Sequence, residues 1–331
     1  MRLLIVNDNT TDQINGVVTT YSHITDIMRT KGIIIKQIDP SHFKNIRGIF
    51  YPDYSLPINP WRLGRLIEDF NPTHVHIATE GVLGIFAKRY FKKRGWNYTS
   101  SYHTRWDIFI EKILGFKLPV SYMIKRFHRD SSAILAPSYL CAKMLHDMGL
   151  TRAVPWSRGV DKTKFKFSDR SNRQGKPVLL NVGRVSPEKG LDDFCSLDKN
   201  KYDLVLVGDG PDLDRLKQKY PYVKFLGALT GEALYKAYQD SDCFVFPSKS
   251  DTFGIVMIES MAVGTPVAAY PVDGPIAVID HGITGFLSRN LSEAVEVCLS
   301  LNRQIVCDHS SKWDWSKVTE EFIQHLVHIN Q

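Results

Sequence analysis

The chain has 331 residues, of which 43% are hydrophobic and 23% are charged, and its formal net charge at pH 7 is +7. This length provides for two domains that each bury their own core. The positive charge favours phosphate-bearing ligands or an anionic membrane surface, and the absence of a nucleic-acid-binding motif argues against a nucleic-acid partner.

Three further features of the sequence exclude other classes of protein. No run of about 18 apolar residues occurs, so we expect no membrane-spanning helix. The 5 cysteines form no C-x-x-C pair, which argues against a disulfide framework and against a structural zinc site. The N-terminal apolar run is too short for a secretory signal, so we expect a cytoplasmic protein.

The first half of the chain alternates short apolar segments with helical patterns. This alternation is typical of βαβ units and predicts a parallel sheet in a Rossmann-like domain over residues 1–160. We expect strands at 3–7, 74–78, 97–102 and 133–138, and helices at 17–31, at 81–94 and up to 148.

The second half repeats the same alternation after a polar stretch at 161–176, which we interpret as a linker. A second Rossmann-like domain is predicted over 177–311, and an amphipathic helix over 312–331, for which packing back on the N-terminal domain is left open. The predicted fold is therefore α/β, with two doubly wound domains that face each other across a cleft. We expect strands of the second domain at 177–184, 202–210, 222–227, 243–248 and 265–270.

Two cations follow the first strand of the second domain, in the stretch "NVGRVSPEKG". Arg184 stands at the end of the strand, and Lys189 lies just before a glycine and the next helix. Because ligands of doubly wound folds bind outside the carboxyl ends of the strands, these cations could clamp a diphosphate. The alternative is that both are ordinary solvated loop residues.

The stretch "GDGPDLDRL" contains a D-x-D spacing at Asp212 and Asp214, which some enzymes use to hold a divalent ion on a sugar nucleotide. An acidic start to a helix explains the same residues, and we favour that reading. The same spacing recurs at Asp240 and Asp242 without special context. We therefore predict no metal site.

The stretch "SDTFGIVMIESMA" places Asp251 just before a helix and Glu259 inside it. The backbone N–H groups after Gly254 begin the helix, and such a helix start binds anions. The neighbours of Glu259 are almost all apolar, and a buried carboxylate is costly without a partner. A ribose, with two vicinal hydroxyls, would be a suitable partner.

In the first half, Gly16 precedes a helix and His103 stands at the end of a predicted strand. A single glycine there could let backbone N–H groups approach a phosphate. It is not the G-x-G-x-x-G fingerprint, which counts against a dehydrogenase. For His103, a structural role and a place beside the ligand both stay open.

Eight segments in order resemble one family: "INGVV", "ATEGVLG", "SYHTRWD", "WSRGVD", "VGRVSPEKG", "LVGDGP", "DTFGIVMIESMAVGTPV" and "GITGFL". The chain resembles the retaining glycosyltransferases of the two-Rossmann GT-B fold, the group 1 family that includes phosphatidylinositol mannosyltransferase and sucrose synthase. Within it, the chain is most similar to GDP-mannose-dependent α-mannosyltransferases and sulfoquinovosyl-lipid synthases. The resemblance covers nearly the whole chain.

The resemblance implies a role for each candidate residue. The first domain would bind the acceptor, and Arg184 and Lys189 would bind the donor diphosphate. Asp251 would bind hydroxyls of the donor sugar, and Glu259 would hold the ribose. His103 would lie beside the transferred sugar as a further catalytic residue. The remaining donor-binding residues would be Gly16, Leu226, Leu229, Thr252, Phe253, Gly254, Ile255 and Val256.

The sequence departs from the family pattern at two positions. Asp251 stands where many members carry a glutamate, although the D-T-F-G form is typical of the subgroup named above. "SRGVD" stands where many members have N-G-V-D, so the resemblance assigns no role to Arg158.

The implied function is retaining transfer of a hexose, mannose or glucose-like, from a nucleotide-diphosphate sugar to a hydroxyl of a lipid-linked or glycan acceptor. No cofactor and no metal are expected. The alternatives are a sugar-nucleotide epimerase or hydrolase on the same fold, or a non-catalytic nucleotide-sugar-binding subunit. Basic clusters at 88–94 and 112–129 leave open a peripheral contact with the inner face of an anionic membrane. The nucleotide, the sugar and the acceptor stay open.

Overall fold

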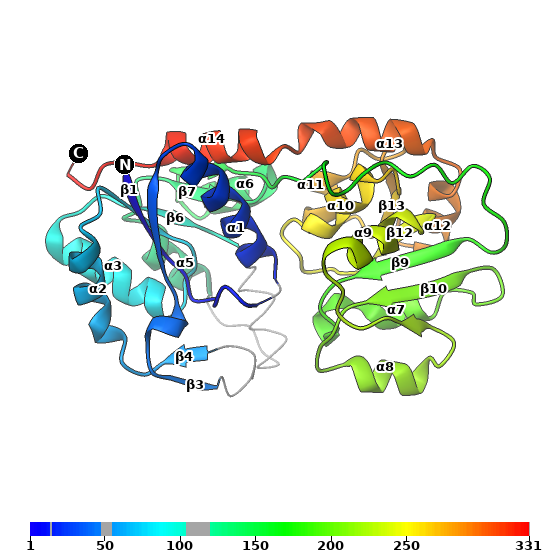
Figure 1. Cartoon of the computed structure of the whole chain (residues 1–331), viewed down its shortest axis with the longest axis horizontal. Helices are drawn as coiled ribbons and strands as arrows, with labels where there is room; N and C mark the ends of the chain where they lie inside the picture. Colours follow the sequence, from blue (N-terminus) through cyan, green and yellow to red (C-terminus); the bar gives the residue numbers. More distant parts are fainter. Residues whose placement is uncertain (14, 48–54, 104–119, 331) are drawn as a thin grey trace. The chain divides into compact units, whose positions relative to one another are not determined.

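The computed structural model describes residues 1–13, 15–47, 55–103 and 120–330. The chain forms two compact units, one of Met1–Arg158 with Trp315–Gln331 and one of Gly159–Asp314. Each unit contains a sheet of 6 strands in which every pair of neighbours is parallel (Figure 1). This finding confirms the predicted fold of two doubly wound α/β domains.

The sheet of the first unit has the strand order β2-β1-β5-β6-β7-β8. After Arg2, its inner strand β1 consists of apolar residues that are all buried, because helices cover both faces of the sheet. The strands are β1 (Arg2–Val6), β2 (Ile34–Ile38), β5 (His74–Ile77), β6 (Thr99–Ser101), β7 (Ile134–Ala136) and β8 (Ala153–Pro155), with a separate antiparallel hairpin of β3 (Asn45–Arg47) and β4 (Ser55–Pro57). The helices are α1 (Gly16–Thr30), α2 (Leu63–Phe70), α3 (Val82–Arg94), α5 (Val120–His128), α6 (Tyr139–Asp147) and α14 (Trp315–His325).

Helix α14 comes from the end of the chain, yet it belongs to the first unit, where it packs beside α1 (Figure 1). Phe322 is fully buried in a cluster that contains Tyr21 and Trp156. The indole N–H of Trp156 donates to the carbonyl of Val318 over 3.0 Å. The last helix therefore completes the core of the unit in which the chain begins.

The sheet of the second unit has the order β11-β10-β9-β12-β13-β14, which is the strand order of the Rossmann fold. Its central strand β12 is buried throughout. The strands are β9 (Val178–Val182), β10 (Asp203–Val207), β11 (Lys224–Phe225), β12 (Cys243–Phe246), β13 (Val267–Ala269) and β14 (Gly285–Leu287). The helices are α7 (Leu191–Cys195), α8 (Leu213–Lys219), α9 (Gly231–Gln239), α10 (Ile255–Ala262), α11 (Asp273–Val278), α12 (Leu291–Cys298) and α13 (Arg303–His309).

The polar stretch 161–176 is attached to the second unit. Phe165 is buried beside Tyr238, with ring centroids 5.6 Å apart. The guanidinium of Arg170 donates to both oxygens of Asp242, at 2.8 and 3.3 Å. These contacts hold the stretch 161–176 against the second unit.

The order of the strands reverses between β1 and β5 in the first unit and between β9 and β12 in the second. In open parallel sheets, ligands bind at the carboxyl ends of the strands on either side of such a reversal. The residues that follow β1, β5, β9 and β12 are therefore candidates for a ligand-binding site. Among the described residues, no helix is long and apolar enough to cross a membrane.

Candidate functional site

The loop after β12 leads into α10 through Gly254, the N-cap of that helix. Gly254 has φ 91°, in the left-handed region, and a Cβ there would lie 2.8 Å from Met257 Cε and 3.0 Å from Phe246 Cζ. Because a glycine has no side chain, it cannot accept from the first N–H groups of α10, and the first turn contains no acidic residue. These N–H groups form a partial positive charge suited to an anion.

Replacing Gly254 with alanine is expected to lower the free energy of unfolding by about 1–3 kcal/mol, because strained φ and a steric clash combine. Gly282 provides the control, since its φ is 79° and nothing lies within 4 Å of its added Cβ. Gly282→Ala should cost only about 1 kcal/mol, for the left-handed backbone alone. Urea-induced unfolding measures both, and equal stability of wild type and Gly254→Ala would refute the packing argument.

Lys189 and Asp251 form an ion pair beside this helix start. Lys189 ends the 3₁₀ turn Pro187–Lys189 that follows β9, and Asp251 follows β12. The ammonium Nζ lies 2.7 Å from Oδ1 and 3.0 Å from Oδ2 of Asp251. Arg184, half-buried, stands between the end of β9 and this turn. The structure thus brings together two residues that are separated by 62 positions in the sequence.

Glu259 lies in α10 and contacts a tyrosine of α9. The hydroxyl of Tyr238 donates to Oε2 of Glu259 over 2.7 Å. Burial raises the pKa of Glu259 to about 7, and the Tyr238 hydrogen bond opposes that rise. Burial and the adjacent carboxylate raise the pKa of Tyr238, so its hydroxyl stays protonated and remains the donor. A buried carboxylate was expected to need a partner. In the structure this partner is Tyr238, which donates to one of the two carboxylate oxygens of Glu259.

One apolar cluster links two of the predicted donor-binding residues, Leu226 and Leu229, to the start of α10. Leu226 and Leu229, which follow β11, are partly buried against this cluster. Phe253 is buried in it, and Ile255 and Val256 pack against it from α10. Five of the predicted donor-binding residues of the second unit therefore belong to one apolar cluster.

His103 lies in the first unit, just after β6, in a group of buried polar side chains. Its Nδ1 is 2.8 Å from Nη2 of Arg158, and its Nε2 is 3.5 Å from the hydroxyl of Tyr21. That hydroxyl lies 2.7 Å from Nε2 of His76 and donates to Ser101 over 2.9 Å. Burial, followed by the charge of Arg158, holds the pKa of His103 well below its usual range.

Gly16 is the first residue of α1 and is exposed. The side chain of Asn15 caps the helix, and its Oδ1 accepts from Val17 and Val18 over 3.0 Å each. Asp8, which follows β1, caps α3 in the same way by accepting from Leu83 over 2.7 Å. Burial raises the pKa of Asp8 to about 6. Two capped helix starts thus lie at the strand reversal of this unit.

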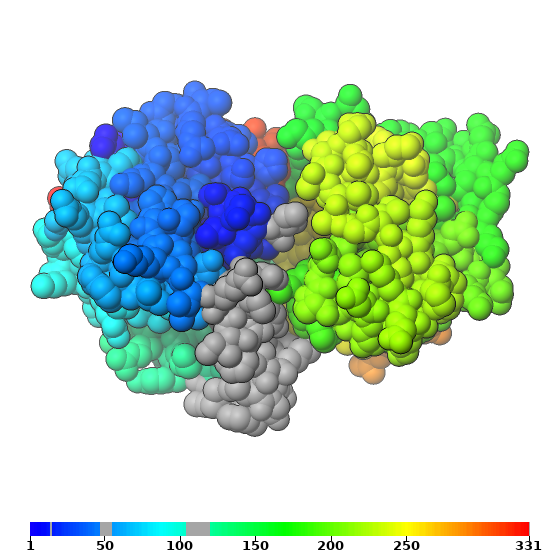
Figure 2. Space-filling view, turned by 60° about the horizontal axis from the view of Figure 1, so that its bottom comes forward, coloured from blue at the N-terminus to red at the C-terminus, as the bar shows by residue number. Residues whose placement is uncertain are grey.

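The carboxylate of Asp212 is engaged by an arginine. Arg215 donates from Nε to Oδ1 and from Nη2 to Oδ2, over 2.5 and 2.7 Å. Asp212 is the N-cap of α8. The part of the chain that contains α8 is coloured yellow-green on the surface of the second unit in Figure 2. The geometry agrees with the interpretation of Asp212 as part of a helix start.

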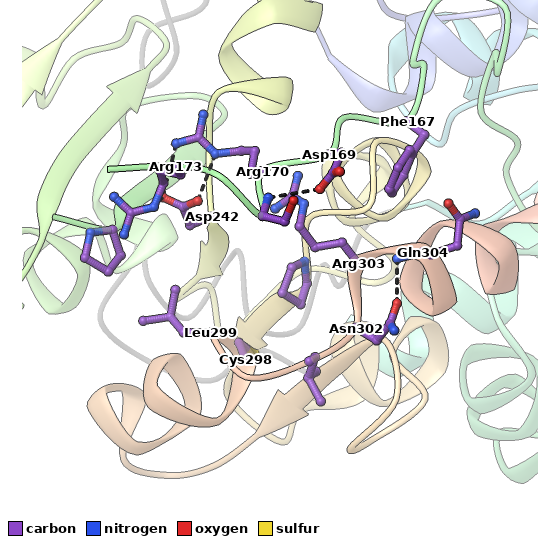
Figure 3. Close-up of a pocket in the computed structure, with 14 residues that line it drawn as sticks. Phe167, Asp169, Arg170, Arg173, Asp242, Cys298, Leu299, Asn302, Arg303 and Gln304 are labelled. Carbon is purple, nitrogen blue, oxygen red and sulfur yellow. Dashed lines mark hydrogen bonds and ion pairs between the residues drawn. The ribbon is translucent and has the colours of Figure 1, made fainter. Parts of the chain in front are cut away.

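A cavity of about 590 Å³ lies elsewhere in the second unit (Figure 3). Its lining includes Pro177, Asp242 and Pro266, each of which directly precedes a strand, so the cavity lies at the amino edge of the sheet. Arg303, also in its lining, donates to the backbone carbonyls of Ser168 and Ser241 and to the Thr265 hydroxyl. None of the predicted site residues is in the lining of this cavity. Its arginines Arg170 and Arg303 make hydrogen bonds that attach neighbouring segments to the sheet.

Four of these polar residues were not predicted from the sequence as parts of a site: Tyr21, His76, Tyr238 and Asp8. The available signal was a polar side chain within an apolar segment, since buried polar groups need partners. Residues 104–107 of the "SYHTRWD" segment and residues 112–119 of the second basic cluster lie outside the described residues. In the cluster at 88–94, Lys88 contacts the carbonyl of Phe127, Lys92 pairs with Asp130 and Arg94 pairs with Glu68.

Two Rossmann-type parallel sheets, with polar side chains after the strands at each reversal, are the elements of the predicted GT-B fold. The family model "Glycosyl transferases group 1" matches residues 162–296, and the model "Glycosyltransferase Family 4" matches residues 33–164. The chain belongs to the glycosyltransferase group 1 family. This membership confirms the resemblance and the glycosyltransferase activity that the sequence indicated.

Two curated relatives and one solved structure illustrate the likeness. The chain is 26% identical to the GDP-mannose-dependent alpha-mannosyltransferase of Corynebacterium glutamicum, over 99% of this chain and 89% of that protein. It is 32% identical to the sulfoquinovosyl transferase SQD2 of Arabidopsis thaliana, over 81% of this chain and 56% of that protein. The structure of HepE from Anabaena in complex with UDP and glucose has a TM-score of 0.74 at 15% identity, covering 98% of both chains, which shows a common fold.

Proposed function

We propose that this protein transfers a hexose, mannose or a glucose-like sugar, from a nucleotide-diphosphate sugar to a hydroxyl of a lipid-linked or glycan acceptor. The transfer retains the anomeric configuration and needs no metal ion. The observation that carries the proposal is the Lys189–Asp251 pair beside the start of α10, at the strand reversal of the second unit. The names of the relatives, a GDP-mannose-dependent mannosyltransferase and a sulfoquinovosyl transferase, support the substrate class.

The donor binds to the second unit in this proposal. The N–H groups at the start of α10 and the side chains of Arg184 and Lys189 take the diphosphate, because they supply positive charge without a metal. Asp251 accepts hydrogen bonds from hydroxyls of the sugar. The second carboxylate oxygen of Glu259 takes the ribose, since Tyr238 already holds the first. Leu226 and Leu229 contact the base.

The chemical step breaks the bond between the anomeric carbon and the diphosphate oxygen. The acceptor oxygen forms its new bond on the same face of the sugar, and its proton passes to the departing phosphate. Negative charge develops on the leaving diphosphate, where Arg184 and Lys189 stabilise it. Asp212 takes no part, because both of its oxygens accept from Arg215.

A peripheral contact with an anionic membrane on the cytoplasmic side is part of this proposal. The basic side chains of α3 that carry it are Arg89 and Lys93, since Lys88, Lys92 and Arg94 are held by the contacts described above. Attraction of this kind weakens with salt.

A panel of UDP-, GDP- and ADP-sugars, followed by lipid and glycan acceptors, tests the function. We expect one nucleotide sugar to bind and to be consumed only when an acceptor is present, and NMR of the product should show the anomeric configuration of the donor. Consumption without an acceptor would instead indicate an epimerase or a hydrolase, and binding without any turnover would indicate a non-catalytic subunit.

The same assay with EDTA tests the absence of a metal. Activity should persist, since the cations of the site are side chains. Loss of activity that Mn²⁺ alone restores would contradict this and return attention to Asp212 and Asp214.

A further inference from the structure

Arg158 is a buried cation in the first unit, with only 4% of its surface exposed. Its guanidinium donates from Nη1 to the carbonyls of Trp156 and Ser157, over 2.9 and 2.8 Å, and lies 4.7 Å from the centre of the Trp156 ring. Its Nη2 lies 2.8 Å from Nδ1 of His103. Within the described part of the chain, no carboxylate lies at ion-pair distance from Arg158, so its polar contacts are two carbonyls and an imidazole.

The contact between Nη2 and Nδ1 has one chemically allowed form. A guanidinium carries only donors, so Nδ1 of His103 must be the acceptor and must carry no proton. A proton on Nδ1 would point one donor at another, and a doubly protonated ring would in addition place two cations side by side in a buried site. The imidazole is therefore neutral, with its single proton on Nε2.

The groups around His103 agree with this assignment. Its Nε2 faces the hydroxyl of Tyr21, at 3.5 Å, and that hydroxyl donates its own proton to Ser101. The oxygen of Tyr21 can then accept from Nε2–H. Burial lowers the pKa of His76 to about 3, so the second imidazole of the group is also neutral. Glu80, an acid of the same unit, lies 3.2 Å from Nε2 of His128.

We propose that Arg158 is a positioning residue that holds His103 as the neutral, Nε2-protonated tautomer. His103 then presents its single proton from Nε2 to the hydroxyl of Tyr21, and it is excluded as a general base. The effect on sugar transfer rests on the proposed function, whereas the tautomer does not. The arginine of "SRGVD", where many family members have asparagine, thereby acquires a role.

The direct test is ¹⁵N NMR of the histidine-labelled protein, with the His103 signals assigned through their loss in His103→Gln. We expect a protonated Nε2 and an unprotonated Nδ1 from about pH 5 to about pH 8, with no titration. A wild-type protein whose His103 carries its proton on Nδ1, or is doubly protonated in this range, would overturn the proposal. This measurement needs no substrate, so it decides the tautomer even if no donor is found.

Three variants test the part played by Arg158. Arg158→Met removes the donor, and both tautomers of His103 should then be populated, with kcat falling about tenfold or more. Arg158→Lys keeps a donor and a charge and should retain the single tautomer. Arg152→Met is the matched control, because Arg152 donates to the carbonyl of Ser131 and not to His103. An unchanged tautomer in a folded Arg158→Met would contradict the proposal.

The role of the Nε2 proton can be tested separately by two amides. The side-chain N–H of Gln reaches the position of Nε2, and that of Asn reaches the position of Nδ1. His103→Gln should therefore retain a larger kcat than His103→Asn, with a smaller difference in KM for the donor. A larger kcat for the asparagine variant would refute donation from Nε2.

Discussion

Lys189→Ala is expected to lower kcat/KM by about a hundredfold or more, the scale on which one electrostatic contact to a developing charge acts. The ammonium group is held against Asp251 by two contacts of 2.7 and 3.0 Å, so its position is fixed before the donor arrives. Arg184→Ala should have an effect of the same size, because Arg184 stands on the same loop after β9. Steady-state kinetics with the active donor measure both.

A surface lysine supplies the control for this prediction. Lys201 pairs with Glu296 in an exposed contact of 3.3 Å, just before β10 and so at the amino edge of the sheet. Lys201→Ala should leave kcat/KM unchanged. If Lys189→Ala or Arg184→Ala retained activity within about threefold of wild type, the assignment of that residue to the diphosphate would be wrong.

The contact between Lys189 and Asp251 also makes their effects dependent on each other. Residues in direct contact give non-additive changes, whereas distant residues add. We therefore expect the double variant Lys189→Ala, Asp251→Asn to lose less activity than the product of the single losses predicts. Changes at Arg184 and Lys201 should instead add.

The sequence was most informative where a local pattern decides the structure. Strands β1 and β12 are short apolar runs buried on both faces of a parallel sheet, and such runs are recognisable without a structure. The carboxyl ends of strands are the sites of doubly wound folds, so Arg184 and Asp251 could be selected from their place after a strand. The edge strands β2, β8 and β14 were not predicted, and each contains residues that are only partly buried.

Contacts between distant segments could not be predicted from the sequence. The pairs Lys189–Asp251 and Arg158–His103 join residues 62 and 55 positions apart, and nothing in either local pattern indicates the partner. The polar stretch 161–176 was predicted to be a linker because its contacts with the sheet cannot be seen in the sequence. Arg170, for example, meets the carboxylate of Asp242 only in the folded chain. Local periodicity therefore predicts helices and strands, whereas the contacts between distant residues that complete the site need the structure.

Glu259→Gln is expected to weaken donor binding and to stabilise the empty protein. Loss of the carboxylate that takes the ribose should cost about 2 kcal/mol, or roughly thirtyfold in Kd, the scale of a hydrogen bond to a charged group. In the wild type, burial raises the pKa of Glu259 from 4.5 to about 7, so ionising this group works against folding. The glutamine is never ionised and avoids that cost.

The sign of the pH dependence follows from where the proton resides. Between about pH 4.5 and about pH 7 the folded state keeps the proton of Glu259 and the unfolded state has lost it. The contribution of Glu259 to stability therefore falls as pH rises through this interval, and then it levels off. A difference of about 2.5 in pKa corresponds to roughly 3 kcal/mol, which is the upper limit of the gain expected for Glu259→Gln at about pH 8.

Donor binding should show the opposite trend, because the ribose needs the ionised carboxylate. For a pKa of about 7, the wild-type affinity is expected to rise about tenfold from about pH 6 to about pH 8, and this rise should be absent in Glu259→Gln. Titration calorimetry and urea-induced unfolding over this range measure the two trends. Glu296→Gln, at an exposed ion pair with Lys201, is the control that should change neither.

Tyr238→Phe separates burial from hydrogen bonding at the same carboxylate. The Tyr238 hydroxyl donates to Glu259 over 2.7 Å and favours its ionised form, so its removal should raise the pKa of Glu259 further. The rise in donor affinity should then move to higher pH than in the wild type, with the ribose contact itself intact. An unmoved midpoint, or a donor affinity independent of pH in the wild type, would show that Glu259 is not the residue that takes the ribose.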